Sequence, residues 1–157
     1  MPRPVLPIVG YRALRANRVS LPGHVYLITT ATHLRRRLFD DFPTARLAVR
    51  ALNDRKTLGH CELTAWVLMP DHLHAILQLG DDDALSQAVN RIKSRIARDV
   101  NRRLRRMGAV WQAGFHERLL REEEDLRGVA RYVVMNPLRA GLVRRVSEYP
   151  HWDAMWL

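Results

Sequence analysis

The sequence has one cysteine, two lysines and no long apolar run, and each scarcity excludes a class of protein. Because Cys61 is alone, no intrachain disulfide can form, which argues against a small secreted fold held by disulfides. No apolar run reaches the roughly 20 residues that span a bilayer, and the N-terminus has no apolar signal core. We therefore expect a soluble, cytoplasmic protein without a membrane partner. Its 157 residues fit a single domain, 1–157, that can bury a core unaided.

Arginine is abundant instead. The chain carries 26 Lys+Arg against 16 Asp+Glu, a net charge of +10, and Lys56 and Lys93 are its only lysines. Arginine binds phosphate with two parallel hydrogen bonds and stacks on bases, which lysine does not do. The excess predicts a polyanionic partner, with nucleic acid first, although a GC-rich genome would also inflate arginine.

Three basic segments are predicted to bind nucleic acid. The first is an N-terminal arm, residues 1–23, which has no acidic residue and ends at a Leu-Pro-Gly turn. The second is a loop, residues 35–37, and the third is the basic face of a long helix. The predicted DNA-binding arginines are Arg12, Arg15, Arg18, Arg35, Arg36, Arg37, Arg95, Arg98 and Arg102.

Runs of apolar residues predict the strands. Residues 24–32 are rich in β-branched and aromatic side chains, and residues 63–69 and 73–79 are apolar runs interrupted at Pro70-Asp71. The last two runs are predicted to form a hairpin around that turn.

Apolar spacing of three and four residues predicts the helices. One runs from Thr44, a plausible N-cap, to about Leu58 and ends at Gly59. The second is a long helix from the acidic residues 81–83 to Met107, ended by Gly108, and the last covers about 122–135. Strands and helices in this order predict an α+β sandwich, with helices packed on an antiparallel sheet.

His72 and His74 are the first candidates for chemistry. Because side chains alternate along a strand, the two imidazoles point to one face, where a pair can bind one divalent ion. An isolated His-x-His is more often two ordinary strand histidines. Here the pair follows an accessible turn, and a metal site needs a third oxygen or amide ligand from elsewhere.

Tyr132 is the candidate nucleophile. A phenol with a pKa of about 10 attacks poorly unless a metal or a basic side chain polarises the phosphate. Asn136 lies four residues later on the same helical face, and it is either a helix cap or a ligand. The alternative for Tyr132 is a surface ring with its hydroxyl in water. His116, in an aromatic turn, is a further candidate for contact with the site or the DNA.

Three motifs in this order resemble the signatures of the REP-associated tyrosine transposases, which are single-tyrosine HUH enzymes, where U is a bulky apolar residue. They are Met-Pro-Asp-His-Leu-His at 69–74, Trp-Gln-Ala-Gly-Phe-His-Glu-Arg at 111–118, and Tyr-Val-Val-Met-Asn-Pro-Leu-Arg-Ala-Gly-Leu-Val at 132–143. Residues 23–29 also resemble the first strand of that family. The resemblance covers about residues 11–143.

The resemblance implies a function. His72 and His74 would bind Mg²⁺ or Mn²⁺, with Asn136 as a polar third ligand. Tyr132 would attack a phosphodiester of single-stranded DNA near REP-type hairpins, forming a 5′-phosphotyrosine and freeing a 3′-hydroxyl. The family fold is a ferredoxin-like sandwich, and the enzyme would act on DNA in the cytoplasm, associated with the nucleoid. Some related enzymes exchange the tyrosine helix between protomers, so monomer and homodimer both stay open.

Two other interpretations remain. A domesticated, non-catalytic regulator on the same fold would bind nucleic acid in a salt-dependent way without cleaving it. An arginine-rich α+β protein with no nucleic-acid role would bind no oligonucleotide at low salt.

Overall fold

Five strands form one antiparallel sheet in the order β4-β1-β3-β2-β5. This computed structural model describes residues 23–121 and 125–156, so the predicted basic arm, up to Leu21-Pro22, lies outside the described residues. The strands are β1 (Val25–Ala31), β2 (Glu62–Met69), β3 (His72–Gln78), β4 (His116–Leu120) and β5 (Trp152–Ala154).

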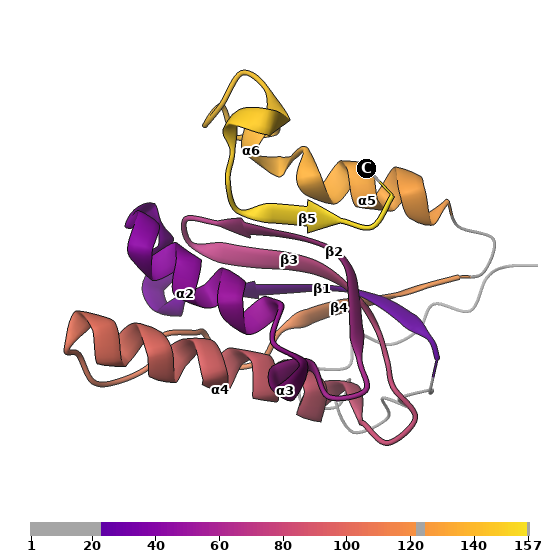
Figure 1. Cartoon of the computed structure of the whole chain (residues 1–157), viewed down its shortest axis with the longest axis horizontal. Coiled ribbons are helices and arrows are strands. Elements are labelled where there is room, and N and C mark those ends of the chain that lie inside the picture. The colour runs from indigo at the N-terminus through magenta and orange to yellow at the C-terminus, as the bar shows by residue number, and fades with distance from the viewer. Residues whose placement is uncertain (1–22, 122–124, 157) are drawn as a thin grey trace, which may run out of the picture.

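Helices cover both faces of the sheet (Figure 1). On one face lie α2 (Phe42–Leu52), α3 (Arg55–Leu58) and α4 (Leu85–Leu104), and on the other lie α5 (Leu126–Val134) and α6 (Asn136–Arg139). Short 3₁₀ turns occur at His33–Arg35, Leu38–Asp40 and Val146–Glu148. The order β1-α2-β2-β3-α4-β4 is the βαββαβ arrangement of ferredoxin-like folds, so the predicted α+β sandwich is confirmed.

Two apolar clusters hold the layers together. Because side chains alternate along each strand, β3 sends Leu73 and Leu77 into a large core with α2 and α4, where Ile96 is fully buried. Ile76 points the other way, into a smaller core with Val133 of α5. The two faces of β3 therefore pack against different helices, and the apolar core on the α5 side is the smaller of the two.

The predicted helix from Thr44 to Leu58 is two helices, and this boundary was wrong. Asp41, not Thr44, is the N-cap, and its carboxylate accepts a hydrogen bond from the backbone N–H of Thr44. The chain breaks at Asn53, and Asp54 caps the next helix through the N–H of Lys56. Gly59 ends that helix as predicted, with a φ of 62°.

The later helices are also shorter than predicted. The long helix begins at Leu85 and ends at Leu104, because Arg105 adopts the left-handed conformation three residues before Gly108. The described part of the last helix begins at Leu126, and its terminus at Val134 leads directly into α6. Two edge strands, β4 and β5, were not predicted. Within residues 23–121 and 125–156, no helix is both long and apolar enough to cross a membrane.

Candidate active site

His72 and His74 lie together on the α5 face of β3, as their spacing predicts. Leu73 and Ala75 between and beside them enter the opposite core, which fixes the histidines on this face. The two ring centroids are 4.8 Å apart and the rings meet edge to face. The pair stands at the start of β3, directly after the Pro70-Asp71 turn, so the hairpin positions both imidazoles at one end of the sheet.

Each imidazole is held through its Nδ1 atom. The Thr29 hydroxyl lies 2.8 Å from Nδ1 of His74, at the position on β1 that pairs directly with it. Nδ1 of His72 lies 2.6 Å from a carboxylate oxygen of Asp71, whose other oxygen is 3.1 Å from Nε of Arg35. Histidines that bind metals are commonly oriented in this way, by a partner on the ring nitrogen that does not bind the ion. The Nε2 atoms are the ones left to coordinate.

The electrostatics also fit a divalent ion. Burial, and then the neighbouring charges of His72, Arg139 and Arg35, lower the pKa of His74 to about 4. The ring is therefore neutral near pH 7, and neutral imidazole is the form that binds metals. No cluster of three His, Cys, Asp or Glu side chains occurs among residues 23–121 and 125–156, so within that part of the chain a third protein ligand would be of another type.

Asn136 is such a residue, and it stands at the start of α6. Its side-chain Nδ2 donates a hydrogen bond of 2.9 Å to the carbonyl of Val133, which fixes the direction of the amide. The residue that caps α5 is Met135, so Asn136 is not the backbone cap, although its side chain satisfies a terminal carbonyl. The amide oxygen makes no hydrogen bond to the described part of the chain.

Tyr132 projects from α5 with 62% of its surface exposed, so its ring is not part of the core. The guanidinium carbon of Arg139 lies 3.9 Å from the ring centroid, and Nη2 of Arg139 donates to the Tyr132 carbonyl at 2.7 Å. The positive charge of Arg139 also contributes to the lowered pKa of His74. On its other side Tyr132 borders a shallow hollow that Arg118 also lines.

The predicted DNA-binding arginines fall in different places. Arg35 belongs to the site through Asp71, whereas Arg37 forms an ion pair with Asp40. Arg95 is paired with Asp54 and Asp99.

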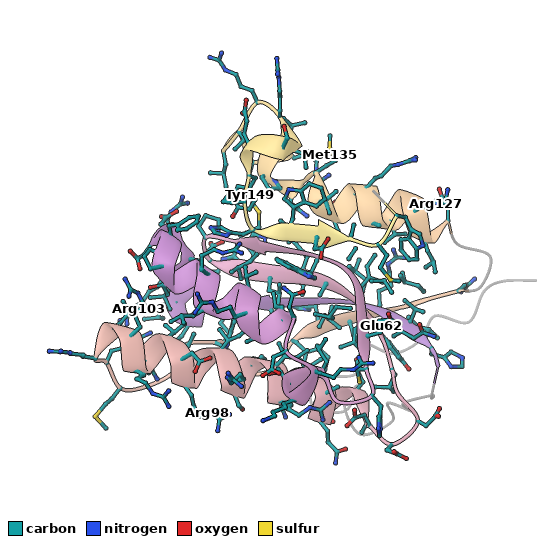
Figure 2. The ribbon with its side chains drawn as sticks, viewed as in Figure 1. Glu62, Arg98, Arg103, Arg127, Met135 and Tyr149 are labelled. Atoms are coloured by element: carbon teal, nitrogen blue, oxygen red, sulfur yellow. The ribbon has the colours of Figure 1, made fainter. Side chains whose placement is uncertain are left out.

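Arg98 (Figure 2) and Arg102 are exposed residues of α4, and α4 covers the sheet face opposite to α5 (Figure 1). The exposed Arg36 follows the first 3₁₀ turn. Arg12, Arg15 and Arg18 lie outside the described residues.

His116 pairs directly with Thr29 across β4 and β1, so its side chain shares the face of the histidine pair. Sequence reasoning missed Thr29, Asp71 and Arg139 as parts of the site. Asp71 stands next to His72 inside the quoted motif, which was a usable signal. Thr29 reaches the site through strand register, which no local pattern shows. Arg139 lies two helical turns after Tyr132, and this spacing of seven was a usable signal.

The chain is similar to known transposases in sequence. A sequence model of the family described as "Transposase IS200 like" matches residues 21–136. The REP-associated tyrosine transposase of Escherichia coli (strain K12) is 34% identical over 91 residues, which are 57% of this chain and 52% of that protein. A Haemophilus influenzae (strain ATCC 51907 / DSM 11121 / KW20 / Rd) relative is 30% identical over 100 residues, 57% of each chain. The chain thus spans about half the length of the curated relatives it matches.

A solved structure agrees with the fold. The structure described as a REP-associated tyrosine transposase bound to a REP hairpin superposes with a TM-score of 0.68 at 26% identity. The match covers 87% of this chain and 79% of the other.

Proposed function

Because the chain belongs to the IS200-like transposase family, we propose that it is a metal-dependent endonuclease and strand transferase that cuts single-stranded DNA with Tyr132. The observation that carries the proposal is the His72–His74 pair. Both rings are held at Nδ1, one of them by the Thr29 hydroxyl, and both face the layer that carries the exposed Tyr132. The similarity to an enzyme whose solved structure is described as bound to a REP hairpin supports hairpin DNA of that type as substrate.

In the proposed reaction the Tyr132 hydroxyl oxygen attacks the phosphorus of a phosphodiester. A tyrosyl O–P bond forms and the P–O3′ bond breaks. The phenol loses its proton and the departing 3′ oxygen takes one up. The products are a 5′-phosphotyrosine and a free 3′-hydroxyl. Since the covalent link conserves the bond, a 3′-hydroxyl can reverse the step and rejoin a strand without a nucleotide cofactor.

His72 and His74 would hold the divalent ion, Mg²⁺ or Mn²⁺, through their Nε2 atoms, with the Asn136 amide oxygen as third ligand. Such an ion polarises the scissile phosphate and spreads its developing charge. Thr29 and Asp71 keep the two rings in the coordinating orientation. Arg139 holds the Tyr132 ring and backbone, which restricts the direction from which the hydroxyl attacks.

The histidine pair and the tyrosine helix belong to the same sheet face of one chain, which supports a site completed within one protomer. Along this face α5 packs mainly over β2, with further contacts to β3 and β5. The neighbouring strands β1 and β4 place Thr29, His116 and Arg118 on the same face. This strip beside Tyr132 is the proposed path of the DNA strand.

The test is formation of a covalent protein–DNA adduct. Hairpin oligonucleotides with single-stranded flanks, taken from the genome that encodes the chain, are incubated with protein and Mn²⁺ and run on a denaturing gel. We expect a slow-migrating adduct with wild-type protein, none with Tyr132→Phe, and none with His74→Ala.

Tyr149→Phe is the matched control, because the Tyr149 hydroxyl is bonded to the Leu68 carbonyl, and it should form the adduct normally. The contrary result is that all these proteins bind the hairpins in a salt-dependent way but none of them forms an adduct. That result would contradict the proposal and favour the non-catalytic regulator.

A further inference from the structure

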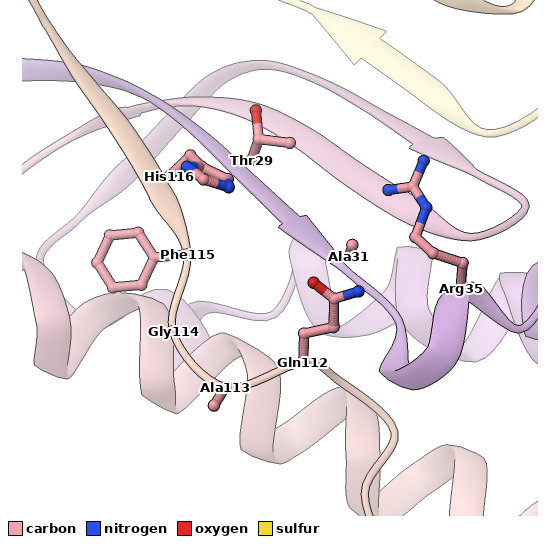
Figure 3. A pocket seen from close by; sticks show the side chains of 8 residues that line it. All are labelled: Thr29, Ala31, Arg35, Gln112, Ala113, Gly114, Phe115 and His116. Atoms are coloured by element: carbon pink, nitrogen blue, oxygen red, sulfur yellow. The ribbon is translucent and has the colours of Figure 1, made fainter. Parts of the chain in front are cut away.

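A pocket of about 360 Å³ opens beside the histidine pair, at the end of β1 (Figure 3). Its size lies within the range of small-ligand sites. In Figure 3, Arg35 and His116 stand at opposite ends of the pocket, and Ala31 and Gln112 lie between them. The residues that line it are Thr29, Ala31, Arg35, Gln112, Ala113, Gly114, Phe115 and His116.

The pocket shares two walls with the proposed metal site. Thr29, on one side, holds Nδ1 of His74. Arg35, on another, binds Asp71, which in turn holds His72. The pocket therefore borders Thr29, which contacts His74, and Arg35, which contacts His72 through Asp71. We expect a DNA strand with its scissile phosphate at the histidines to bring a neighbouring nucleotide to the pocket.

The loop that forms the far wall is fixed in place before any ligand binds. The buried ammonium of Lys93 donates to the carbonyls of Gln112 and Gly114, at 2.9 and 2.7 Å. The backbone N–H of Gln112 donates to the Ala31 carbonyl at 2.9 Å. The Trp111 indole N–H donates to the carbonyl of Lys93 at 3.1 Å. These bonds hold the loop to α4 on one side and to β1 on the other, so the pocket is preorganised.

The chemistry of the walls suits a nucleobase. The Ala31 side chain offers apolar surface to a flat ring, whereas the Phe115 ring is buried in the large core. The side-chain amide of Gln112 makes no hydrogen bond to any described residue, so both its donor and its acceptor are available for a base edge. Arg35 uses Nε for Asp71, and its exposed terminal nitrogens are at the pocket, where a backbone phosphate would pass.

We propose that this pocket receives one unpaired nucleobase of the DNA strand, flanking the scissile phosphate. Gln112 hydrogen-bonds the edge of that base, and Arg35 contacts the adjoining phosphate. The inference rests on the proposed function and adds to it a position at which the protein itself reads the single-stranded flank.

The experiment measures coupling between Gln112 and individual bases. Fluorescently labelled hairpin oligonucleotides carry an abasic site at each successive flank position, and their binding is measured by anisotropy without divalent ions. For wild-type protein, we expect the abasic site at one position to weaken binding about tenfold. Gln112→Ala should weaken binding to the intact oligonucleotide and abolish most of the effect of that one abasic site, since both changes remove the same contact.

Gln78→Ala is the matched control, because Gln78 is an exposed glutamine at the other end of β3. It should leave the abasic profile of the wild type unchanged. The contrary result is that Gln112→Ala and each abasic site reduce the affinity independently, so that their fold-losses multiply at every position. That result would overturn the pocket assignment, even if the adduct with Tyr132 forms. Wild-type protein that binds none of the oligonucleotides would overturn the proposed function as well.

Discussion

The guanidinium of Arg139 lies 3.9 Å from the centroid of the Tyr132 ring and donates a hydrogen bond to the carbonyl of the same residue. The two residues are seven apart, two helical turns, and they are brought together because the chain stays helical through Met135 from α5 into α6. A cation over an aromatic face contributes about 0.5–1 kcal/mol at exposed sites, and a charged hydrogen bond about 1.5–3 kcal/mol. These contacts restrain an otherwise exposed tyrosine in one orientation.

Loss of Arg139 should therefore slow attack by Tyr132. We expect Arg139→Ala to reduce the rate of adduct formation about tenfold or more, and Arg139→Lys, which keeps the charge, to reduce it less. Binding of Mn²⁺, followed by electron paramagnetic resonance, should change little in either variant. Arg127→Ala removes an exposed arginine from the same helix and should react like wild type. Equal rates for Arg139→Ala and Arg127→Ala would show that the contact has no role in the reaction.

Thr29→Val should weaken metal binding, because it removes the partner that orients His74. Changes to such orienting partners typically reduce metal affinity about 10–100-fold. Titration of Mn²⁺ by calorimetry measures the change. The control is Thr30→Val, because Thr30 is buried on the opposite face and its hydroxyl has no hydrogen-bond partner among the described residues. The same affinity loss in both variants would contradict a specific role for Thr29.

Tyr149 should make the stability of the protein sensitive to alkaline pH. Burial, followed by the charge of Asp40, raises the pKa of Tyr149 to about 12, and the hydroxyl donates to the Leu68 carbonyl at 2.6 Å. Because the folded pKa is above that of a free phenol, about 10, the stabilisation is complete below pH 10 and is lost as pH rises through 12.

Urea unfolding of Tyr149→Phe measures this contribution. At pH 8 the variant should be less stable than wild type by about 1 kcal/mol. The difference should shrink between pH 10 and pH 12, as Tyr149 ionises in the unfolded wild-type chain. A difference that stays constant over this pH range would show that the Tyr149 hydroxyl does not act as the buried donor.

Lys93→Met should destabilise the fold and loosen the loop at residues 112–114. The substitution leaves two carbonyls without their charged donor, at about 1–3 kcal/mol for each unsatisfied group. Lys56→Met, which alters the only other lysine at an exposed position, should change the free energy of unfolding by less than about 0.5 kcal/mol. Denaturant unfolding measures both variants, and similar stability of the two would refute the structural role of Lys93.

Much of the fold could be predicted from the sequence, because its buried elements have strong apolar patterns. The hairpin that carries His72 and His74 is marked by two apolar runs around Pro70-Asp71. By contrast, β4 is an edge strand with only its last residue, Leu120, buried, so its sequence shows no apolar alternation. The last strand, β5, is three residues long and too short for any pattern.

The candidate site could likewise be predicted only in part. The spacing of His72 and His74 predicted their shared face, because that depends only on strand geometry. The contact of Thr29 with His74 depends on the register between β1 and β3, which residues far apart in the chain determine together. The separate break at Asn53 was also missed, since the apolar stripe continues across it.

In the proposed reaction, Tyr132 is the residue that becomes covalently linked to DNA. Trypsin cleaves after Arg131 and Arg139, so residues 132–139 form one peptide in which Tyr132 is the only tyrosine. An adduct formed with Mn²⁺ on a hairpin labelled at its 3′ end is trimmed by nuclease and trypsin and sequenced by tandem mass spectrometry. We predict that the label stays with the protein and that a 5′-linked nucleotide is found on Tyr132. A nucleotide on any other residue, or linkage through the 3′ end, would contradict the account.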